Sequence, residues 1–410
     1  MPVNTIQATA THRTHELLRD ARALLAANDA ALVRSQVALS EIPSPTGMEG
    51  ERARYVAFRL RDAGLDIETD SVGNVIAQLG ERTETAPVVV CAHLDTVFAA
   101  ADDVTVTTDG SRLIGRGIGD NARGLAAMIA LAETMQRTGL QTRRPIVWLA
   151  TVGEEALGDL RGAKHYFASD TGRHTHAALI VDGPGDERVV HRAVGSRRWR
   201  VRFTGSGGHS WSAYGLPNPL NAAGSFAAMI AALEIPAEPR TTLSVTRIIG
   251  GVSINAIPGE ALVEIDLRSV SQAVLEQLSR EVRALVDASL GEENDRRARG
   301  TRPLVSTVEL IGDRPAGETS ESHPLVATAI EATRLIGRAP ELAAASTDAN
   351  VPIALGIPAI ALGAGGQGGD AHTPQEWFAN IDGSAGIARL LTVLCATAGL
   401  SGSPGHVSIE

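Results

Sequence analysis

The hydrophobic pattern of the first two hundred residues is dominated by near-continuous apolar runs that end in polar side chains. Such runs occupy residues 87–95, 146–155 and 177–183, and a similar one covers residues 357–362. Runs of this kind are typical of parallel strands that are covered on both faces of a sheet. A further strand is predicted over 71–77, and helical spacing predicts helices over 13–39, 49–64, 120–139, 323–337 and 383–399. The alternation of strands and helices predicts an α/β domain.

From about residue 193 the pattern changes to strict alternation. Trp199, Val201 and Phe203 alternate with arginines, which indicates a strand that is buried on one face only. This strand is followed by a predicted helix over 217–233, strands over 241–249 and 260–269, a helix over 272–290 and a strand over 303–311. The order β-α-β-β-α-β is that of a ferredoxin-like unit. Residues 291–297 are highly charged and are predicted to form an exposed loop.

The two patterns together predict two domains. At 410 residues the chain exceeds the usual size of one hydrophobic core. The α/β pattern of residues 1–192 resumes at 314–410, so these segments are expected to fold together as a discontinuous domain. Residues 193–313 are then an inserted α+β domain.

Charge and cysteine content narrow the classes of function. The formal charge is −10 and no long basic run occurs, so no nucleic-acid partner is expected. The two cysteines, Cys91 and Cys395, lie in apolar segments, which favours a reducing compartment without a disulfide framework. Neither an apolar signal sequence nor a stretch long enough to cross a membrane is found. A soluble, cytoplasmic protein is therefore expected, with no membrane partner.

Five residues share a position at or just beyond the end of an apolar run or at a helix start: His93, Asp120, Glu155, Asp182 and His372. Imidazole and carboxylate groups without thiolate suit zinc, or cobalt or manganese in its place. Five ligands exceed the need of one tetrahedral ion, whereas two ions that share a bridging carboxylate would use them all. Such ion pairs polarise a carbonyl group and generate hydroxide near neutral pH, so hydrolysis is the predicted chemistry.

Each of these residues also has a simple structural explanation. Asp120 could cap the helix that follows it, and the histidines could be hydrogen-bonded structural residues. The adjacent Glu154 and Glu155 could belong to a solvated turn. A nucleotide-binding enzyme is disfavoured, because the glycines of 115–117 and 363–366 lack the spacing of the dinucleotide fingerprint.

The ordered set of motifs resembles the co-catalytic zinc exopeptidase family that includes peptidase T, glutamate carboxypeptidase, acetylornithine deacetylase and the aminoacylases. The motifs are residues 92–97, 115–120, 153–155, 182–183, 208–209, 266–268 and 372–376. The resemblance implies a mixed-sheet, dizinc aminopeptidase-like catalytic domain with an inserted ferredoxin-like lid through which two subunits form a homodimer.

The resemblance also implies a role for each candidate residue. Asp120 would bridge two zinc ions per subunit, with His93 and Asp182 completing one site and Glu155 and His372 the other. Asp95 would accept the second imidazole N–H of His93 and so fix its tautomer. Glu154 would remain outside the metal shells as the general base that passes a proton to the leaving amine.

In the inserted domain the resemblance implies that His209 supports the oxyanion in the neighbouring protomer's site. The alternative is a turn histidine beside two glycines. Asn255 and Arg268 match positions that contact substrate, with Arg268 binding a carboxylate, although an ion pair with Asp266 is an equal alternative. Residues 346–350 resemble a substrate-facing loop, and helix or turn capping is the competing interpretation.

Asp182 bears on the class of substrate, and residues 121–123 bear on the metal site. In this resemblance an aspartate at 182 accompanies the peptidase branches, which favours cleavage of small peptides by a di- or tripeptidase or a carboxypeptidase. An N-acyl or N-carbamoyl amino-acid amidohydrolase is the second reading. Residues 121–123 depart from the acidic residue and lysine of many relatives, which puts the tuning of the metal ligands in doubt. The presence of Glu154 and all five ligands argues against a non-catalytic relative.

Overall fold

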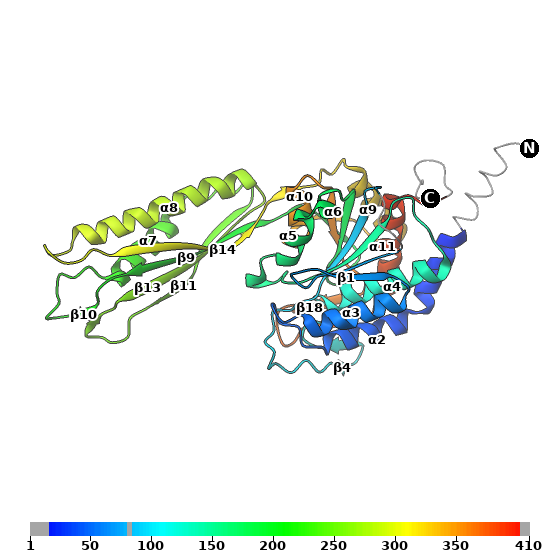
Figure 1. The fold of residues 1–410 in the computed structure, drawn as a ribbon, viewed down its shortest axis with the longest axis horizontal. Helices are drawn as coiled ribbons and strands as arrows, with labels where there is room; N and C mark the ends of the chain where they lie inside the picture. The colour runs from blue at the N-terminus through cyan, green and yellow to red at the C-terminus, as the bar shows by residue number, and fades with distance from the viewer. Residues whose placement is uncertain (1–15, 80–83, 402–410) are drawn as a thin grey trace, which may run out of the picture. The chain divides into compact units, whose positions relative to one another are not determined.

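The computed structural model describes residues 16–79 and 84–401. These residues divide into two compact units. The first consists of the described residues up to Ala193 together with those from Glu318 onward, and the second is Val194–Gly317. Each unit has its own hydrophobic core. Figure 1 shows the helices and strands of each unit.

The first unit is built on a nine-stranded mixed sheet in the order β1-β2-β6-β3-β7-β17-β8-β15, with β16 paired to β8. Its strands are β1 (Asp66–Thr69), β2 (Val75–Gln78), β3 (Val88–His93), β6 (Ile146–Thr151), β7 (Ala177–Val181), β8 (Arg188–Ala193), β15 (Gly317–Glu318), β16 (Glu341–Ala345) and β17 (Ala359–Leu362). The four central strands β6, β3, β7 and β17 run parallel to one another. Their carboxyl ends therefore lie at one edge of the sheet.

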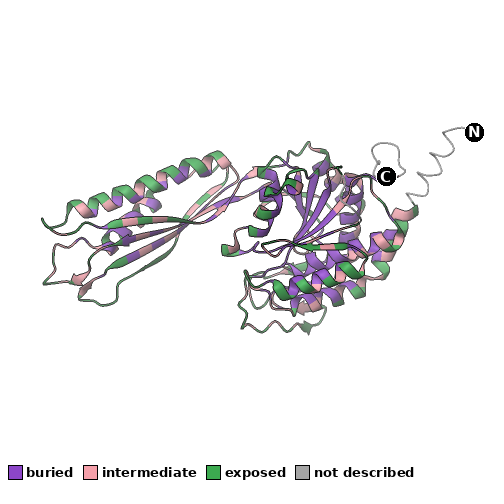
Figure 2. Ribbon diagram, viewed as in Figure 1, coloured by how far each residue is buried: buried purple, intermediate pink, exposed green. Residues whose placement is uncertain are grey.

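Helices cover both faces of this sheet. One core contains residues of α2 (Asp29–Ser40), α3 (Gly50–Asp62), α4 (Ala122–Thr138), α9 (Pro324–Leu335) and α11 (Gly383–Ala398). The opposite core contains residues of α5 (Arg161–Ala168) and α10 (Asn350–Ala354), and α6 (Asp170–Arg173) packs beside α5. Alternate residues of β3 enter the two cores, as expected for a central strand that is buried on both faces. Figure 2 shows that the strands at the centre of this sheet are largely buried. A short 3-10 helix, η1 (Ala156–Gly158), follows the paired glutamates.

A second sheet of the first unit was not predicted from the sequence. It has four short strands in the order β18-β19-β5-β4. The strands are β4 (Thr107–Asp109), β5 (Arg112–Ile114), β18 (Gln367–Gly369) and β19 (Trp377–Ala379). β5 leads directly into the segment that ends at Asp120, and the loop between β18 and β19 contains His372.

The second unit has the expected β-α-β-β-α-β order. Its elements are β9 (Gly195–Thr204), α7 (Pro219–Ala232), β11 (Thr241–Gly250), β13 (Glu260–Ser269), α8 (Gln272–Asp295) and β14 (Val305–Arg314). The four strands form an antiparallel sheet in the order β11-β13-β9-β14. As the alternation predicted, Trp199, Val201 and Phe203 are buried in its core. Two short strands of the same unit pair separately from this sheet: β10 (Gly208–His209), between β9 and α7, and β12 (Ala256–Ile257), between β11 and β13.

Three element predictions were wrong. Residues 291–295 belong to α8 rather than to a loop, and Glu293 is buried because it accepts hydrogen bonds from Asn218 N and Asn221 Nδ2. Residues 71–74 form a turn in which Asp70 accepts three backbone N–H groups, so the strand begins only at Val75. The predicted helix over 13–39 is interrupted at Asn28, and residues 13–15 of it lie outside the described part of the chain.

Two further observations concern the chain as a whole. Cys91 and Cys395 are buried free thiols. Within 16–79 and 84–401, none of the helices combines the length and apolar character needed to cross a membrane.

Candidate metal centre

Three of the five ligand candidates lie where central parallel strands end. His93 is the last residue of β3, Asp182 directly follows β7, and Glu155 lies four residues beyond the end of β6. β3 is hydrogen-bonded to both β6 and β7, so these side chains emerge at one edge. The carboxyl ends of parallel strands are the usual location of ligand sites in open α/β sheets.

Asp120 and His372 reach the same edge from the small sheet. The Asp120 carboxylate joins the two imidazoles: Oδ1 lies 2.9 Å from His93 Nε2, and Oδ2 lies 3.1 Å from His372 Nε2. His372 Nε2 also lies 3.1 Å from Glu155 Oε1. The capping alternative for Asp120 is wrong, because the N-cap of α4 is Asn121, whose side chain accepts the N–H of Gly124.

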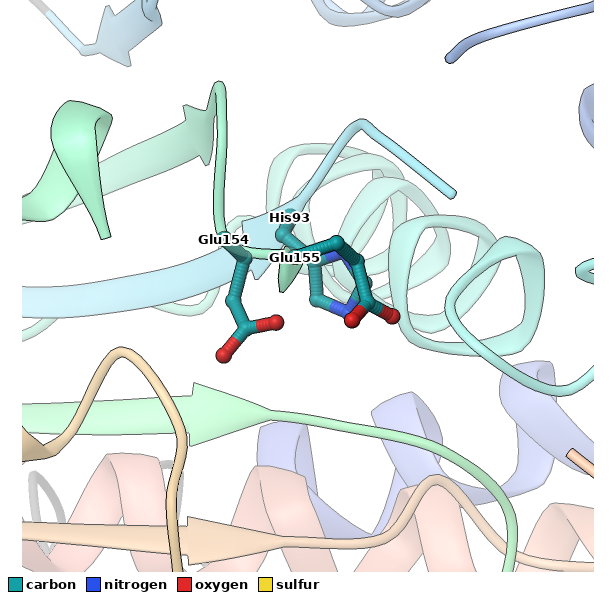
Figure 3. A group of neighbouring side chains, drawn as sticks. All are labelled: His93, Glu154 and Glu155. Atoms are coloured by element: carbon teal, nitrogen blue, oxygen red, sulfur yellow. The ribbon is translucent and has the colours of Figure 1, made fainter. Parts of the chain in front are cut away.

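The five candidates form two overlapping triplets. His93, Asp120 and Asp182 have ligand atoms within 4.8 Å of one another, and so do Asp120, Glu155 and His372. Asp120 is the member common to both. A third group of potential ligands consists of His93, Glu154 and Glu155, whose side chains extend to the same side (Figure 3). The donor set and the shared carboxylate fit a pair of divalent ions.

The electrostatics of the cluster show how strongly it attracts positive charge. Burial and the neighbouring Asp120 raise the pKa of Asp182 to about 7. Hydrogen bonds to Asp120 and Glu155 raise the pKa of His372 to about 10. The pKa of His93 is raised well above its usual value despite burial, because Asp120 and Asp95 stabilise the imidazolium. Without metal, protons on the imidazoles thus take the positions that cations would occupy.

Metal binding is therefore expected to release protons. Ligand imidazoles and carboxylates must be deprotonated, so at pH 7 about two protons should leave the imidazoles of each protein molecule that fills the centre, and part of a third should leave Asp182. Affinity should therefore rise with pH. Calorimetric titration in buffers of different ionisation enthalpy measures this number. Binding of ions without proton release would show that His93 and His372 are not both ligands.

Asp95 holds the paired glutamates in place. Its carboxylate is fully buried and accepts the backbone N–H of Glu154 through Oδ1 and that of Glu155 through Oδ2, both at 2.9 Å. Thr46 Oγ1 donates to the same carboxylate. His93 Nδ1 lies 3.1 Å from the backbone oxygen of Asp95 and 3.6 Å from its carboxylate. The Asp95 carboxylate thus orients the glutamates, whereas the acceptor for the His93 imidazole is the backbone oxygen of Asp95 rather than the carboxylate that the sequence proposed.

Glu376 holds the loop that ends at Asp120 in place. The sequence analysis assigned no role to this residue. Its buried carboxylate accepts the backbone N–H groups of Gly117, Gly119 and Asp120, each at 2.8 Å. Burial raises the pKa of Glu376 to about 7, although the hydrogen bonds from the backbone act in the opposite direction. The sequence signal that could have identified Glu376 is its position in the motif of residues 372–376, four residues after His372.

The departure at residues 121–123 has a structural explanation. Besides capping α4, Asn121 donates to Val181 O and accepts the N–H of Gly183, so it ties the helix start to the end of β7. A side chain at Gly124 would clash with Val181 O, which shows how closely helix and strand approach. Arg123 is fully buried and donates to backbone oxygens of Ala364 and Gly383. It therefore joins α4 to the glycine-rich loop and to α11.

Replacement of Arg123 should test this structural role. Arg123→Ala is expected to lower the free energy of unfolding by about 3 kcal/mol, because it leaves buried carbonyl groups without donors. The exposed Arg137→Ala on the same helix is the matched control and should change stability by less than about 0.5 kcal/mol. Equal stability of the two variants in urea denaturation would contradict the assignment.

The remaining predicted site residues belong to the second unit. The structure brings His209 and Asn255 together, because His209 pairs with Ala256 across β10 and β12 and the backbone oxygen of Asn255 accepts the N–H of Ser210. Both side chains are exposed. Arg268 lies near the C-terminal end of β13, whereas β12 precedes the N-terminal end of that strand. Its Nε donates to Asp266 at 2.6 Å. The ion pair that was its alternative is thus present.

The loop of residues 346–350 contains the capping contacts that were the alternative to substrate binding. Thr347 Oγ1 accepts the N–H of Ala349, and Asn350 Oδ1 accepts the N–H of Thr347. Asp348, between them, is buried.

Comparison with known proteins identifies the family. A family model described as Peptidase family M20/M25/M40 matches residues 89–397, which is more than half of the chain. The chain belongs to this family. The matched segment contains all five ligand candidates and Glu154. Members of this family are metal-dependent hydrolases, and the residues described above are candidates for the metal centre of the M20 protein.

Individual relatives agree with this assignment. The M20 protein is 33% identical over 234 residues to the putative [LysW]-lysine/[LysW]-ornithine hydrolase of Aeropyrum pernix, a match that covers 56% of this chain and spans 61% of that relative's length. A tripeptidase from Staphylococcus aureus has a similar structure, with a TM-score of 0.73 and 21% identity over 90% of this chain and 98% of its own. Aminopeptidase PepT from Bacillus cereus has a TM-score of 0.69 and 21% identity over 88% and 96% of the two chains. At these identities the solved structures show a shared fold.

Proposed function

We propose that the M20 protein is an exopeptidase that hydrolyses small peptides at a centre of two divalent ions, with zinc as the expected metal. The observation that carries the proposal is the sharing of Asp120 between two ligand triplets. One ion would be held by His93, Asp120 and Asp182, and the other by Asp120, Glu155 and His372. When bound, such ions polarise the scissile carbonyl and lower the pKa of a water molecule.

Glu154 is the proposed general base. It is buried beside His93 and Glu155, but it is absent from the two triplets that share Asp120. A carboxylate that is not needed as a ligand can take the proton from the attacking water and pass it to the nitrogen of the leaving amine. Asp95 fixes the backbone of Glu154, so the carboxylate is presented from an ordered turn.

His209 is proposed to stabilise the oxyanion. Its Nδ1 accepts the backbone N–H of Trp211 at 3.2 Å, so the neutral ring carries its proton on Nε2. Nε2–H is then a donor that an oxyanion can accept. Because His209 is exposed within its own unit, we propose that it serves the site of a second subunit.

The surface around His209 supports a homodimer formed through the second unit. Trp211 and Tyr214 are 87% and 88% exposed, and Val252 and Ile254 are also exposed. The edge strand β11 exposes Ile248. Apolar side chains at an open sheet edge are typical of surfaces that a partner covers.

Two candidate activities differ in the class of amide bond that is cleaved. Asp182 favours peptides as substrates, and Asn255 and Arg268 are proposed to contact them, with Arg268 a donor to a substrate carboxylate. The curated relative named as a hydrolase rather than a peptidase supports the second candidate, an N-acyl or N-carbamoyl amino-acid amidohydrolase. The same metal centre can cleave either bond.

Assay of a substrate panel tests the proposal. Di- and tripeptides with free or blocked termini are compared with N-acyl and N-carbamoyl amino acids at saturating metal. Cleavage of peptides is expected, and sensitivity to blocking of one terminus shows which end is bound. Cleavage confined to the acyl or carbamoyl compounds would replace the exopeptidase proposal with the amidohydrolase.

A further inference from the structure

A buried carboxylate outside the proposed ligand set contacts the ends of two strands that carry candidate ligands. Asp348, in the loop between β16 and α10, is only 1% exposed. Its Oδ2 accepts the hydroxyl hydrogen of Thr151 at 2.5 Å and lies 3.6 Å from Cys91 Sγ. Both of these partners are completely buried.

The strand register shows how close Asp348 is to the proposed ligands. Thr151 ends β6 and pairs with His93, which ends the parallel neighbour β3. Side chains two residues apart on a strand point to the same face, so Cys91 and His93 share a face and lie about 7 Å apart along β3. Asp348 contacts Cys91 and Thr151 on that face. Its carboxylate therefore lies on the same face of the sheet as the His93 side chain.

The negative charge of Asp348 matters because the proposed centre would carry a net positive charge. Two divalent ions bring four positive charges, whereas the proposed ligands Asp120, Asp182 and Glu155 supply three negative ones. Around them lie further buried carboxylates, those of Glu154, Asp95 and Asp348. Buried carboxylates close to the ligands offset the difference, and a charge in a low-dielectric interior acts over several ångströms.

We propose that Asp348 is a positioning residue of the metal centre whose buried negative charge strengthens the binding of divalent ions. This inference rests on the proposed function, because it requires that the cluster of candidate ligands binds metal. It assigns a role to a residue of the 346–350 loop that does not require contact with substrate.

Measurement of zinc affinity on chelator-stripped protein tests the inference. Asp348→Asn keeps an oxygen that can accept from Thr151 but removes the charge. It is expected to raise the Kd for zinc about tenfold, the lower end of the loss seen when residues around metal ligands are replaced. The melting temperature of the metal-free variant should not fall, because an uncharged amide is cheaper to bury than a carboxylate. A merely structural role would lower this melting temperature and leave the Kd unchanged.

Thr151→Val is the matched control. It removes the hydroxyl donor and keeps the Asp348 charge, so the Kd should stay within about threefold of the wild-type value. Asp348→Ser also removes the charge and provides a second variant if the amide does not fold. Unchanged zinc affinity in the folded Asp348 variant, or an equal loss in Thr151→Val, would overturn the inference. A wild-type protein that binds no divalent ion would instead overturn the proposed function, and this inference with it.

Discussion

Glu154→Gln is expected to reduce kcat by roughly a thousandfold or more while both metal ions remain bound. The amide keeps the shape of the side chain but cannot accept a proton from water at neutral pH. Because Glu154 lies outside the two triplets that share Asp120, its loss should leave the metal content unchanged. Metal analysis of the purified variant and its turnover of a peptide substrate measure the two effects separately.

Glu155→Gln is the matched control for this prediction, since it makes the same chemical change at the next residue. Glu155 belongs to the triplet with Asp120 and His372, so its replacement should weaken metal binding as well as activity. The opposite result, in which Glu154→Gln loses metal and Glu155→Gln retains it, would exchange the roles of the two glutamates.

His209→Ala is expected to lower kcat by about a hundredfold, the usual effect of removing one oxyanion donor. Metal content and stability should be unchanged, because His209 is exposed and lies in the second unit. Mixing this variant with Glu154→Gln provides a sharper test. If each site uses His209 of the other subunit, a mixed dimer contains one site with both residues intact, and part of the activity should return. Mixtures that stay inactive under subunit exchange would show that His209 does not act between subunits.

The sequence predicted those parts of the site that depend on strand ends. His93, Asp182 and the glutamate pair follow apolar runs, and parallel strands necessarily end at the same edge of a sheet. The prediction therefore required no knowledge of contacts between distant residues. The β-α-β-β-α-β unit was predictable for a similar reason, because its strand face alternates in the sequence.

The residues that hold the loops could not be found in this way. Glu376 accepts the N–H of Asp120 across 256 positions of the chain, and Asp95 accepts those of Glu154 and Glu155. Contacts between a carboxylate and the backbone leave no periodic pattern. The same holds for Glu293, which is charged and yet buried because backbone and amide donors surround it. Buried polar groups are determined by the donors that the fold brings to them.

The most direct test of the account is a titration of chelator-stripped protein with zinc, in which bound metal and hydrolysis of a dipeptide are followed together. We expect no hydrolysis without metal and a rate that reaches its maximum when two ions per chain are bound, as the two triplets around Asp120 require. Full activity in the stripped protein, or a chain that holds two ions and cleaves neither peptides nor acyl amino acids, would contradict the account.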